Sequence, residues 1–279
     1  ISEEPLREYV PLQRPSRGVE GGISMTQFPM EPIAQLGLLK MDFLGLANLT
    51  ILKRAIDLVG PIAGKLLDLQ TIPLDDSNTF QLLSSGETAD VFQLEGSGMR
   101  RYIKALKPAS LAEVSAMVAL YRPGPMEHIE SYINSKHGGE VRYPHSSLED
   151  VLKETYGVIV YQDQVLRIVQ IVAGYSLGEA DVVRKAMGKK IPSIMRKERV
   201  RFIEGASAQG YTNGEAEEIF HLIEPFAGYA FNKAHAVSYA LIAYWTAYFK
   251  ANHTVEYMAA VLSVRMENQE RVAAAVTEC

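Results

Sequence analysis

The sequence predicts a mainly α-helical protein, with a large helical region that follows a small α/β portion at the N-terminus. From about residue 73 onward, apolar residues recur with the 3.6-residue period of amphipathic helices. Several of these segments begin with a capping signal, such as the S-L-A-E box that starts at Ser110. The first thirty residues are instead rich in proline and glycine. We therefore predict an α/β portion over 1–60, a linker over 61–72 and a helical domain over 73–279.

A hairpin and a helix are predicted in the α/β portion. Short extended pieces over 9–12 and 23–28 are separated by a turn-rich stretch, which is consistent with a β-hairpin. Residues 48–59 have helical periodicity, with Asn48 as the N-cap. Gly60 is expected to end this helix.

A strand is predicted over 36–43, because the residues of L-G-L-L-K-M-D-F alternate in polarity. This alternation places Lys40 and Asp42 on one face. A carboxylate beside a lysine can bind a divalent metal while the amine neutralises a phosphate, an arrangement that suits phosphoryl transfer. From the spacing alone, an exposed ion pair at a strand edge is the favoured interpretation.

The helical region contains one further predicted strand, G-V-I-V-Y over 157–161, where β-branched residues are concentrated. The remaining segments are expected to be helices. The predicted helices cover 76–83, 98–106, 110–120, 126–136, 147–154, 162–172, 177–188, 192–209, 215–224, 234–250, 254–266 and 268–278.

The composition is typical of a soluble globular protein, with 47% hydrophobic and 22% charged residues. The longest apolar run, over 236–249, is too short and too often interrupted to span a membrane, which needs about 20 predominantly apolar residues. A single cysteine excludes an internal disulfide framework and a multi-cysteine metal site, and fits a reducing cytosol. The sequence begins at Ile1 and stops at Cys279 within an apolar-periodic run, so we expect an internal piece of a longer chain.

The net charge of −5 argues mildly against nucleic-acid binding, because nucleic-acid-binding domains are usually basic. Positive charge is nevertheless concentrated between residues 184 and 201. A solvated helix face is the more common explanation of such a run, and contact with a polyanion is the alternative.

Two short motifs place cations or hydrogen-bonding groups at the end of a predicted helix. R-K-A-M-G-K-K over 184–190 combines an arginine fork, which fits phosphate oxygens, with compact lysine charges. F-N-K-A-H-A over 231–236 brings an asparagine, a lysine and a histidine into a loop that precedes the aromatic-rich helix. A lone histidine is more often structural, but His235 stands beside Asn232 and Lys233.

Six segments together resemble the palm and fingers of the bacterial C-family replicative polymerases, the DNA polymerase III alpha subunits. They follow the family's order and approximate spacing over nearly the whole chain. The six segments are L-L-K-M-D-F-L-G-L (38–46), V-F-Q-L-E-G-S-G-M-R (91–100), A-L-Y-R-P-G-P-M-E (119–127), T-Y-G-V-I-V-Y-Q-D-Q-V (155–165), R-K-A-M-G-K-K (184–190) and F-A-G-Y-A-F-N-K-A-H-A-V-S-Y-A (226–240).

The resemblance implies roles for individual residues. Asp42 matches the family's third catalytic aspartate, a metal ligand, and Lys40 would lie near the triphosphate. Lys185 keeps the charge where the family often has a second arginine, and Ala234 and Ala236 replace residues that often carry hydroxyls. The implied nucleotide-binding residues are Arg184, Lys185, Lys189, Asn232, Lys233 and His235. Arg122 and Lys190 are candidate DNA contacts, although a rigid structural bend between helices is the favoured explanation of the R-P-G-P turn that contains Arg122.

The reaction implied by the resemblance is template-directed transfer of a deoxynucleotidyl group to a primer 3′-hydroxyl, assisted by two Mg²⁺ ions. The family's other two catalytic aspartates lie upstream of the position that matches Ile1, and no D-x-D motif occurs here, so the chain alone is expected to be inactive. The implied partners are primer-template DNA, deoxynucleoside triphosphates and, through other regions, further replicase subunits. A cytoplasmic bacterial location without membrane contact is expected.

Two other function classes would need different features of the sequence. A helical nucleic-acid-binding module without chemistry would bind phosphates through its basic cluster, with a steep salt dependence and no competition by nucleotides. A different metal-dependent phosphotransferase would need a phosphate-cradling glycine loop, and neither G-x-x-x-x-G-K-[ST] nor G-x-G-x-x-G occurs.

Overall fold

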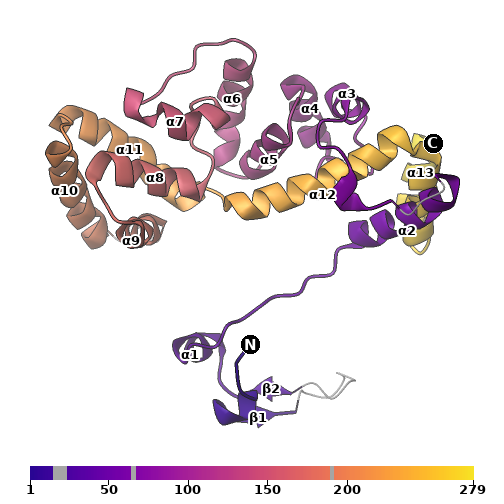
Figure 1. Cartoon of the computed structure of the whole chain (residues 1–279), viewed down its shortest axis with the longest axis horizontal. Helices are drawn as coiled ribbons and strands as arrows, with labels where there is room; N and C mark the ends of the chain where they lie inside the picture. The colour runs from indigo at the N-terminus through magenta and orange to yellow at the C-terminus, as the bar shows by residue number, and fades with distance from the viewer. Residues whose placement is uncertain (15–23, 64–66, 189–191) are drawn as a thin grey trace. The chain divides into compact units, whose positions relative to one another are not determined.

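The computed structural model describes residues 1–14, 24–63, 67–188 and 192–279, which form two compact units. Unit 1 is Ile1–Leu46 and unit 2 is Ala47–Cys279, and each is described by itself (Figure 1). Among the described residues, no helix combines the length and apolar character that a membrane span requires.

Unit 1 contains the predicted hairpin in a shortened form. β1 (Leu12–Gln13) and β2 (Met25–Thr26) pair antiparallel, with Leu12 opposite Thr26. A 3-10 helix, η1 (Leu6–Glu8), precedes them and a short helix, α1 (Met30–Gln35), follows.

The predicted strand over 36–43 is wrong. The chain has no regular element between α1 and the end of unit 1. The N–H groups of residues 36–38 donate to carbonyl oxygens of α1, and Leu39 exchanges two hydrogen bonds with the N-terminal residue, from Leu39 N–H to Ile1 O at 3.2 Å and from the Ile1 amino group to Leu39 O at 2.5 Å. A strand requires a ladder of partner hydrogen bonds, and the described residues supply none along 40–46. The side chains do not separate into two faces either, because Leu39 and Met41 are as exposed as Lys40 and Asp42.

Unit 2 consists of helices and connecting loops in its described residues. Its α-helices are α2 (Ala47–Ala63), α3 (Ser77–Ser85), α4 (Ser97–Leu106), α5 (Leu111–Leu120), α6 (Ile129–Lys136), α7 (Glu149–Leu152), α8 (Gln162–Ala173), α9 (Leu177–Gly188), α10 (Pro192–Ala208), α11 (Asn213–Tyr229), α12 (Lys233–Asn252), α13 (Thr254–Arg265) and α14 (Gln269–Glu278). The 3-10 turns are η2 (Leu69–Thr71), η3 (Pro125–His128), η4 (Ser146–Leu148) and η5 (Lys153–Thr155).

Most predicted helices are confirmed, with differences at their ends. The helix predicted over 147–154 is instead divided into η4, the four-residue α7 and η5, and the one predicted over 126–136 begins with η3. α2 continues through Gly60 and contains Pro61, so the expected end of this helix at Gly60 is wrong. α11 extends past the predicted 215–224 and contains Pro225. The predicted strand over 157–161 is wrong, because only Tyr161 forms a bridge there, a parallel one with Phe231.

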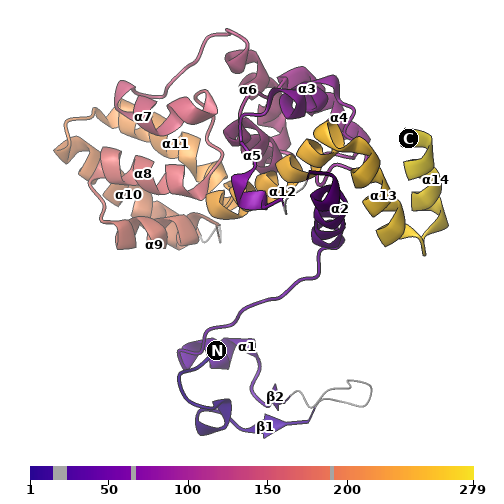
Figure 2. The same ribbon diagram turned by 45° about the vertical axis from the view of Figure 1, so that its right-hand side comes forward.

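The helices of unit 2 form two groups that α12 connects (Figures 1 and 2). α12 packs against α2, α3, α5 and α13, while α8 to α11 pack mainly on one another. Along α12, small residues that are fully buried recur at helical spacing and allow close approach of neighbouring helices. These residues are Ala236, Ala240, Ala243 and Ala247.

The helical group that contains α8 to α11 has its own core. It is built from side chains of α7 to α11 and of the loop that follows η5, including Ile168, Phe202 and Phe220. Phe202 and Phe220 pack with ring centroids 5.4 Å apart. α12 begins beside this group and runs into the other helical group, where it packs on α2, α3, α5 and α13 (Figure 1).

Candidate functional site

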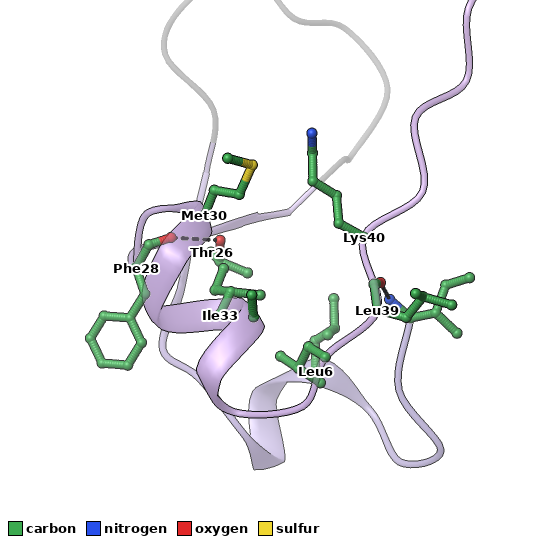
Figure 3. Close-up of a pocket in the computed structure, with 10 residues that line it drawn as sticks. Leu6, Thr26, Phe28, Met30, Ile33, Leu39 and Lys40 are labelled. Carbon is green, nitrogen blue, oxygen red and sulfur yellow. Dashed lines mark hydrogen bonds between the residues drawn. The ribbon is translucent and has the colours of Figure 1, made fainter. Parts of the chain in front are cut away.

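Lys40 and Asp42 form an exposed ion pair in unit 1. Lys40 Nζ lies 2.8 Å from Asp42 Oδ1, with side chains 55% and 65% exposed. Lys40 also lines a largely apolar cavity of about 540 Å³, together with Leu6, Ile33 and Leu39 (Figure 3). Within the described ranges, no group of three or more acidic, histidine or cysteine side chains is placed to hold a metal ion. Asp42 is thus a single accessible carboxylate, neutralised by Lys40.

In unit 2, three of the six motif segments meet beside the N-terminus of α12. The first contact joins the segment before α8 to the segment before α12. Phe231 N–H donates to Val160 O at 2.9 Å, and Gln162 N–H donates to Phe231 O at 2.9 Å. These bonds form the parallel bridge between Tyr161 and Phe231.

Arg122 provides the second contact, from the R-P-G-P turn. Its Nε donates to Ala119 O at 2.8 Å, and its Nη2 donates to Tyr229 O at 2.6 Å. The guanidinium carbon also lies 4.2 Å from the centroid of the Phe231 ring. Burial lowers the pKa of Arg122, but arginine remains charged at neutral pH. Arg122 thus holds the chain on both sides of residue 230.

Gly124 allows the same turn to approach Tyr229. Its φ of +100° is a conformation that side-chain-bearing residues rarely adopt, and a Cβ there would lie 3.0 Å from the Tyr229 ring. The turn is therefore specific for glycine.

The loop before α8 is fixed by the buried side chain of Gln164. Its Oε1 accepts hydrogen bonds from Val160 N–H at 2.8 Å and Tyr161 N–H at 3.0 Å, and its Nε2 donates to Thr155 Oγ1 at 2.8 Å. The role of Gln164 in these bonds is structural.

Asn232, Lys233 and His235 lie together where α12 begins. Asn232 is the N-cap, and its Oδ1 accepts a hydrogen bond from His235 N–H at 2.9 Å. The exposed His235 ring packs against the rings of Tyr239, at 4.2 Å, and Phe231, at 5.5 Å, between centroids. This end of α12 therefore carries an asparagine N-cap, the lysine cation of Lys233 and a partly exposed stack of aromatic rings around His235.

Lys233 is paired with a residue that the sequence did not single out. Its Nζ lies 2.6 Å from Glu154 Oε1 and 5.4 Å from the centroid of the Tyr161 ring. Burial raises the pKa of Tyr161 to about 12, so its hydroxyl is neutral and donates to Ser115 Oγ at 3.0 Å. Glu154 directly precedes the T-Y-G-V-I-V-Y segment, and this adjacency is the only sequence signal for it.

The basic stretch over 184–201 is largely engaged in ion pairs where it is described. Arg184 binds Asp181, with Nη2 to Oδ1 at 2.9 Å, and Arg199 binds Glu217 at 2.5 Å. Arg201 binds Glu179. Among described residues, no hydrogen bond or ion pair joins Arg184 to the α12 site. The side chain of Lys185, and Lys189 and Lys190 entirely, lie outside the described residues.

Comparisons with known proteins give the family. A model of the bacterial DNA polymerase III alpha subunit finger domain matches residues 48–210, and a model of the bacterial DNA polymerase III alpha NTPase domain matches residues 1–45. The chain belongs to the family of bacterial DNA polymerase III alpha subunits.

Relatives named DNA polymerase III subunit alpha align along almost the whole chain. The Thermus aquaticus protein is 50% identical over 279 aligned positions, which cover 98% of this chain and 22% of the relative. The Caulobacter vibrioides protein is 46% identical over 274 positions, with 98% and 24% coverage. The Borreliella burgdorferi protein is 45% identical over 279 positions, with 100% and 24% coverage. The chain thus spans less than a quarter of the length of these relatives.

Proposed function

We propose that this chain is the end of the palm and most of the fingers of a template-directed DNA polymerase, and that it binds the incoming deoxynucleoside triphosphate at the N-terminus of α12. The observation that supports this most is the convergence of three separated segments on that helix end. Arg122 and Tyr161 hold the segment at Phe231, which precedes Asn232, Lys233 and His235.

The groups at this helix end suit a nucleotide. Lys233 supplies a compact cation for phosphate oxygens. The first N–H groups of a helix also attract anions. His235 presents a ring edge and a hydrogen-bonding nitrogen beside the aromatic rings of Phe231 and Tyr239.

Further phosphate and DNA contacts belong to the same proposal. Arg184, Lys185 and Lys189 would face the triphosphate, and Arg184 would exchange its bond to Asp181 for a phosphate oxygen. Arg122 and Lys190 would contact DNA. Arginine has five N–H donors, and the two bonds from Arg122 to carbonyl oxygens leave others for a DNA phosphate.

Asp42 would contribute one carboxylate to the Mg²⁺ site, with Lys40 close to the triphosphate. Mg²⁺ is often held by one or two carboxylates together with substrate phosphates, so a single accessible aspartate fits a contribution to this site but not a complete one. When bound, the metal activates the primer hydroxyl and stabilises the leaving oxygen. Lys40 Nζ lies 2.8 Å from Oδ1 and 3.0 Å from Oδ2 of Asp42, so a metal ion bound by Asp42 would compete with this ion pair. We therefore propose that the isolated chain does not polymerise.

The proposed partners are primer-template DNA, deoxynucleoside triphosphates and other replicase subunits that bind outside this sequence, in the bacterial cytoplasm. Exposed apolar side chains in unit 1, Phe43 at 90% and Leu44 at 85%, support its function within a larger polymerase.

The test is primer extension by the full-length subunit that contains this sequence, with His235→Ala and a range of nucleotide concentrations. We expect His235→Ala to lose contacts worth about 1–2 kcal/mol, which would raise the KM for nucleotide about 5- to 30-fold. His253→Ala is the matched control, because His253 ends α12 and also packs on aromatic rings, those of Tyr248 and Phe249. An unchanged KM in His235→Ala would contradict the nucleotide site. DNA binding that persists without any response to nucleotides would favour a non-catalytic binding module.

A further inference from the structure

The ion pair between Glu154 and Lys233 lies within the proposed nucleotide site. It indicates how the Lys233 side chain is positioned before nucleotide binds. The two residues are 79 positions apart in sequence, and their charged atoms are 2.6 Å apart. Their side chains are 42% and 39% exposed. This contact therefore forms only through the fold and remains open to solvent.

Glu154 is the more rigidly placed partner. It lies in η5, and the next residue, Thr155, donates its hydroxyl to Val158 O at 2.6 Å. Tyr156 and Gly157 then adopt φ values of +52° and +84°. A Cβ on Gly157 would lie 2.7 Å from the backbone oxygen of Arg142, so this turn has little room to shift. Lys233, in contrast, reaches its partner through a flexible four-carbon stem.

Both residues line a groove of about 470 Å³ between η5, α8 and the start of α12. Another carboxylate in this groove, Asp150, pairs with Lys153 at 2.6 Å. Asp163 also lines the groove, but the ion pair that the described structure shows for Lys233 is with Glu154. If Lys233 leaves Glu154, the Tyr161 ring still offers its amine a cation–π contact.

We propose that Glu154 is a positioning residue that holds Lys233 in the nucleotide-free protein and competes with the triphosphate for its amine. This inference rests on the proposed function of Lys233. Half-exposed ion pairs are weak, and a triphosphate carries several negative charges against one on the carboxylate. The amine thus moves from carboxylate to phosphate when nucleotide enters, and Glu154 becomes solvated. Each nucleotide must displace Glu154, which raises the KM.

The experiment compares Glu154→Gln with the unaltered full-length subunit in primer extension at varied nucleotide concentration. Glutamine keeps the size of the side chain and removes its charge. The KM for nucleotide should fall about two- to fivefold, the range expected for a surface ion pair, while kcat stays the same. Asp150→Asn is the matched control, because it removes a carboxylate from the same groove without releasing Lys233, and it should leave the KM unchanged.

Lys233→Ala and the double variant separate the inference from the proposed function. Lys233→Ala should raise the KM, and adding Glu154→Gln to it should change nothing further. If Lys233→Ala leaves the KM unchanged, the proposed function of Lys233 fails. If Lys233→Ala raises the KM but Glu154→Gln leaves it unchanged or raises it, Glu154 does not compete, and this inference alone is overturned. An equal fall in Asp150→Asn would show a general charge effect and would also overturn it.

Discussion

Arg122 Nη2 donates a hydrogen bond to the backbone oxygen of Tyr229 at 2.6 Å, across 107 positions of sequence. This bond, the bond to Ala119 O and the Phe231 ring contact fix the segment that leads into α12. Arg122→Ala should therefore destabilise the fold by about 1.5–3 kcal/mol, the usual loss for hydrogen bonds to a charged group. The KM for nucleotide should rise as well, and urea denaturation together with steady-state primer extension would measure both effects.

Arg122→Lys separates this positioning role from a DNA contact. Lysine keeps the charge but cannot reproduce the planar fork and ring contact, so it should behave more like alanine in both measurements. The positioning role of Arg122 is wrong if Arg122→Lys has the same stability and nucleotide KM as the unaltered protein. In that case Arg122→Ala should only weaken DNA binding, in a salt-dependent way.

Gly124→Ala should destabilise the protein by about 1–3 kcal/mol, because alanine must adopt a strained positive φ and its Cβ would lie against the Tyr229 ring. Gly214→Ala provides the comparison. Gly214 lies in α11 with open space around its Cβ position and should be neutral or stabilising by up to about 1 kcal/mol. Thermal unfolding measures both variants, and a Gly124→Ala protein as stable as Gly214→Ala would refute the tight packing at this turn.

Glu113 joins α5 to the turn that carries Glu154. Burial would raise its pKa, but hydrogen bonds from Ala109 N–H, Lys136 and Tyr156 outweigh this and lower it below the ordinary 4.5. Because the folded-state pKa is depressed, the stabilisation is present above about pH 4.5 and is lost as the pH falls through the folded-state value. Glu113→Gln breaks this buried pair and should cost roughly 3–5 kcal/mol at neutral pH.

Urea denaturation at several pH values tests this prediction. In Glu113→Gln, the free energy of unfolding should fall less steeply below pH 4.5 than it does in the unaltered protein. Glu140→Gln, which removes an exposed partner of Arg142, should leave the curve close to that of the unaltered protein. Equal acid sensitivity in the unaltered protein and Glu113→Gln would contradict the assignment.

Helices were predictable because their signals are local. Asp76, Ser110 and Asn268 each accept a hydrogen bond from a backbone N–H three residues later, as N-cap residues do. Both predicted isolated strands failed for the opposite reason. A strand exists only with a partner, and the segments over 36–43 and 157–161 find no ladder in the described chain beyond one bridge.

The sequence indicates candidate site residues, which stay predictions, but it does not indicate their contacts. The motif over 231–236 already indicated Asn232, Lys233 and His235. Their surroundings depend on distant segments, and no periodicity or spacing pairs Lys233 with Glu154. Ion pairing of Arg184 with Asp181 was foreseeable from their three-residue helical spacing, whereas its contact with a triphosphate stays a prediction.

Primer extension by the full-length subunit with Asp42→Asn tests whether this chain contributes to catalysis. The substitution keeps the size of the side chain and removes the charge that a metal ligand needs. Asp57→Asn is the matched control, because Asp57 also forms an exposed pair with a lysine, Lys53, at 2.6 Å. We expect Asp42→Asn to lose activity by on the order of 10³-fold, equivalent to about 4 kcal/mol of barrier, with Asp57→Asn nearly unaffected. Near-normal activity of Asp42→Asn would place the catalytic carboxylates elsewhere and leave Lys40 and Asp42 as an ordinary surface ion pair.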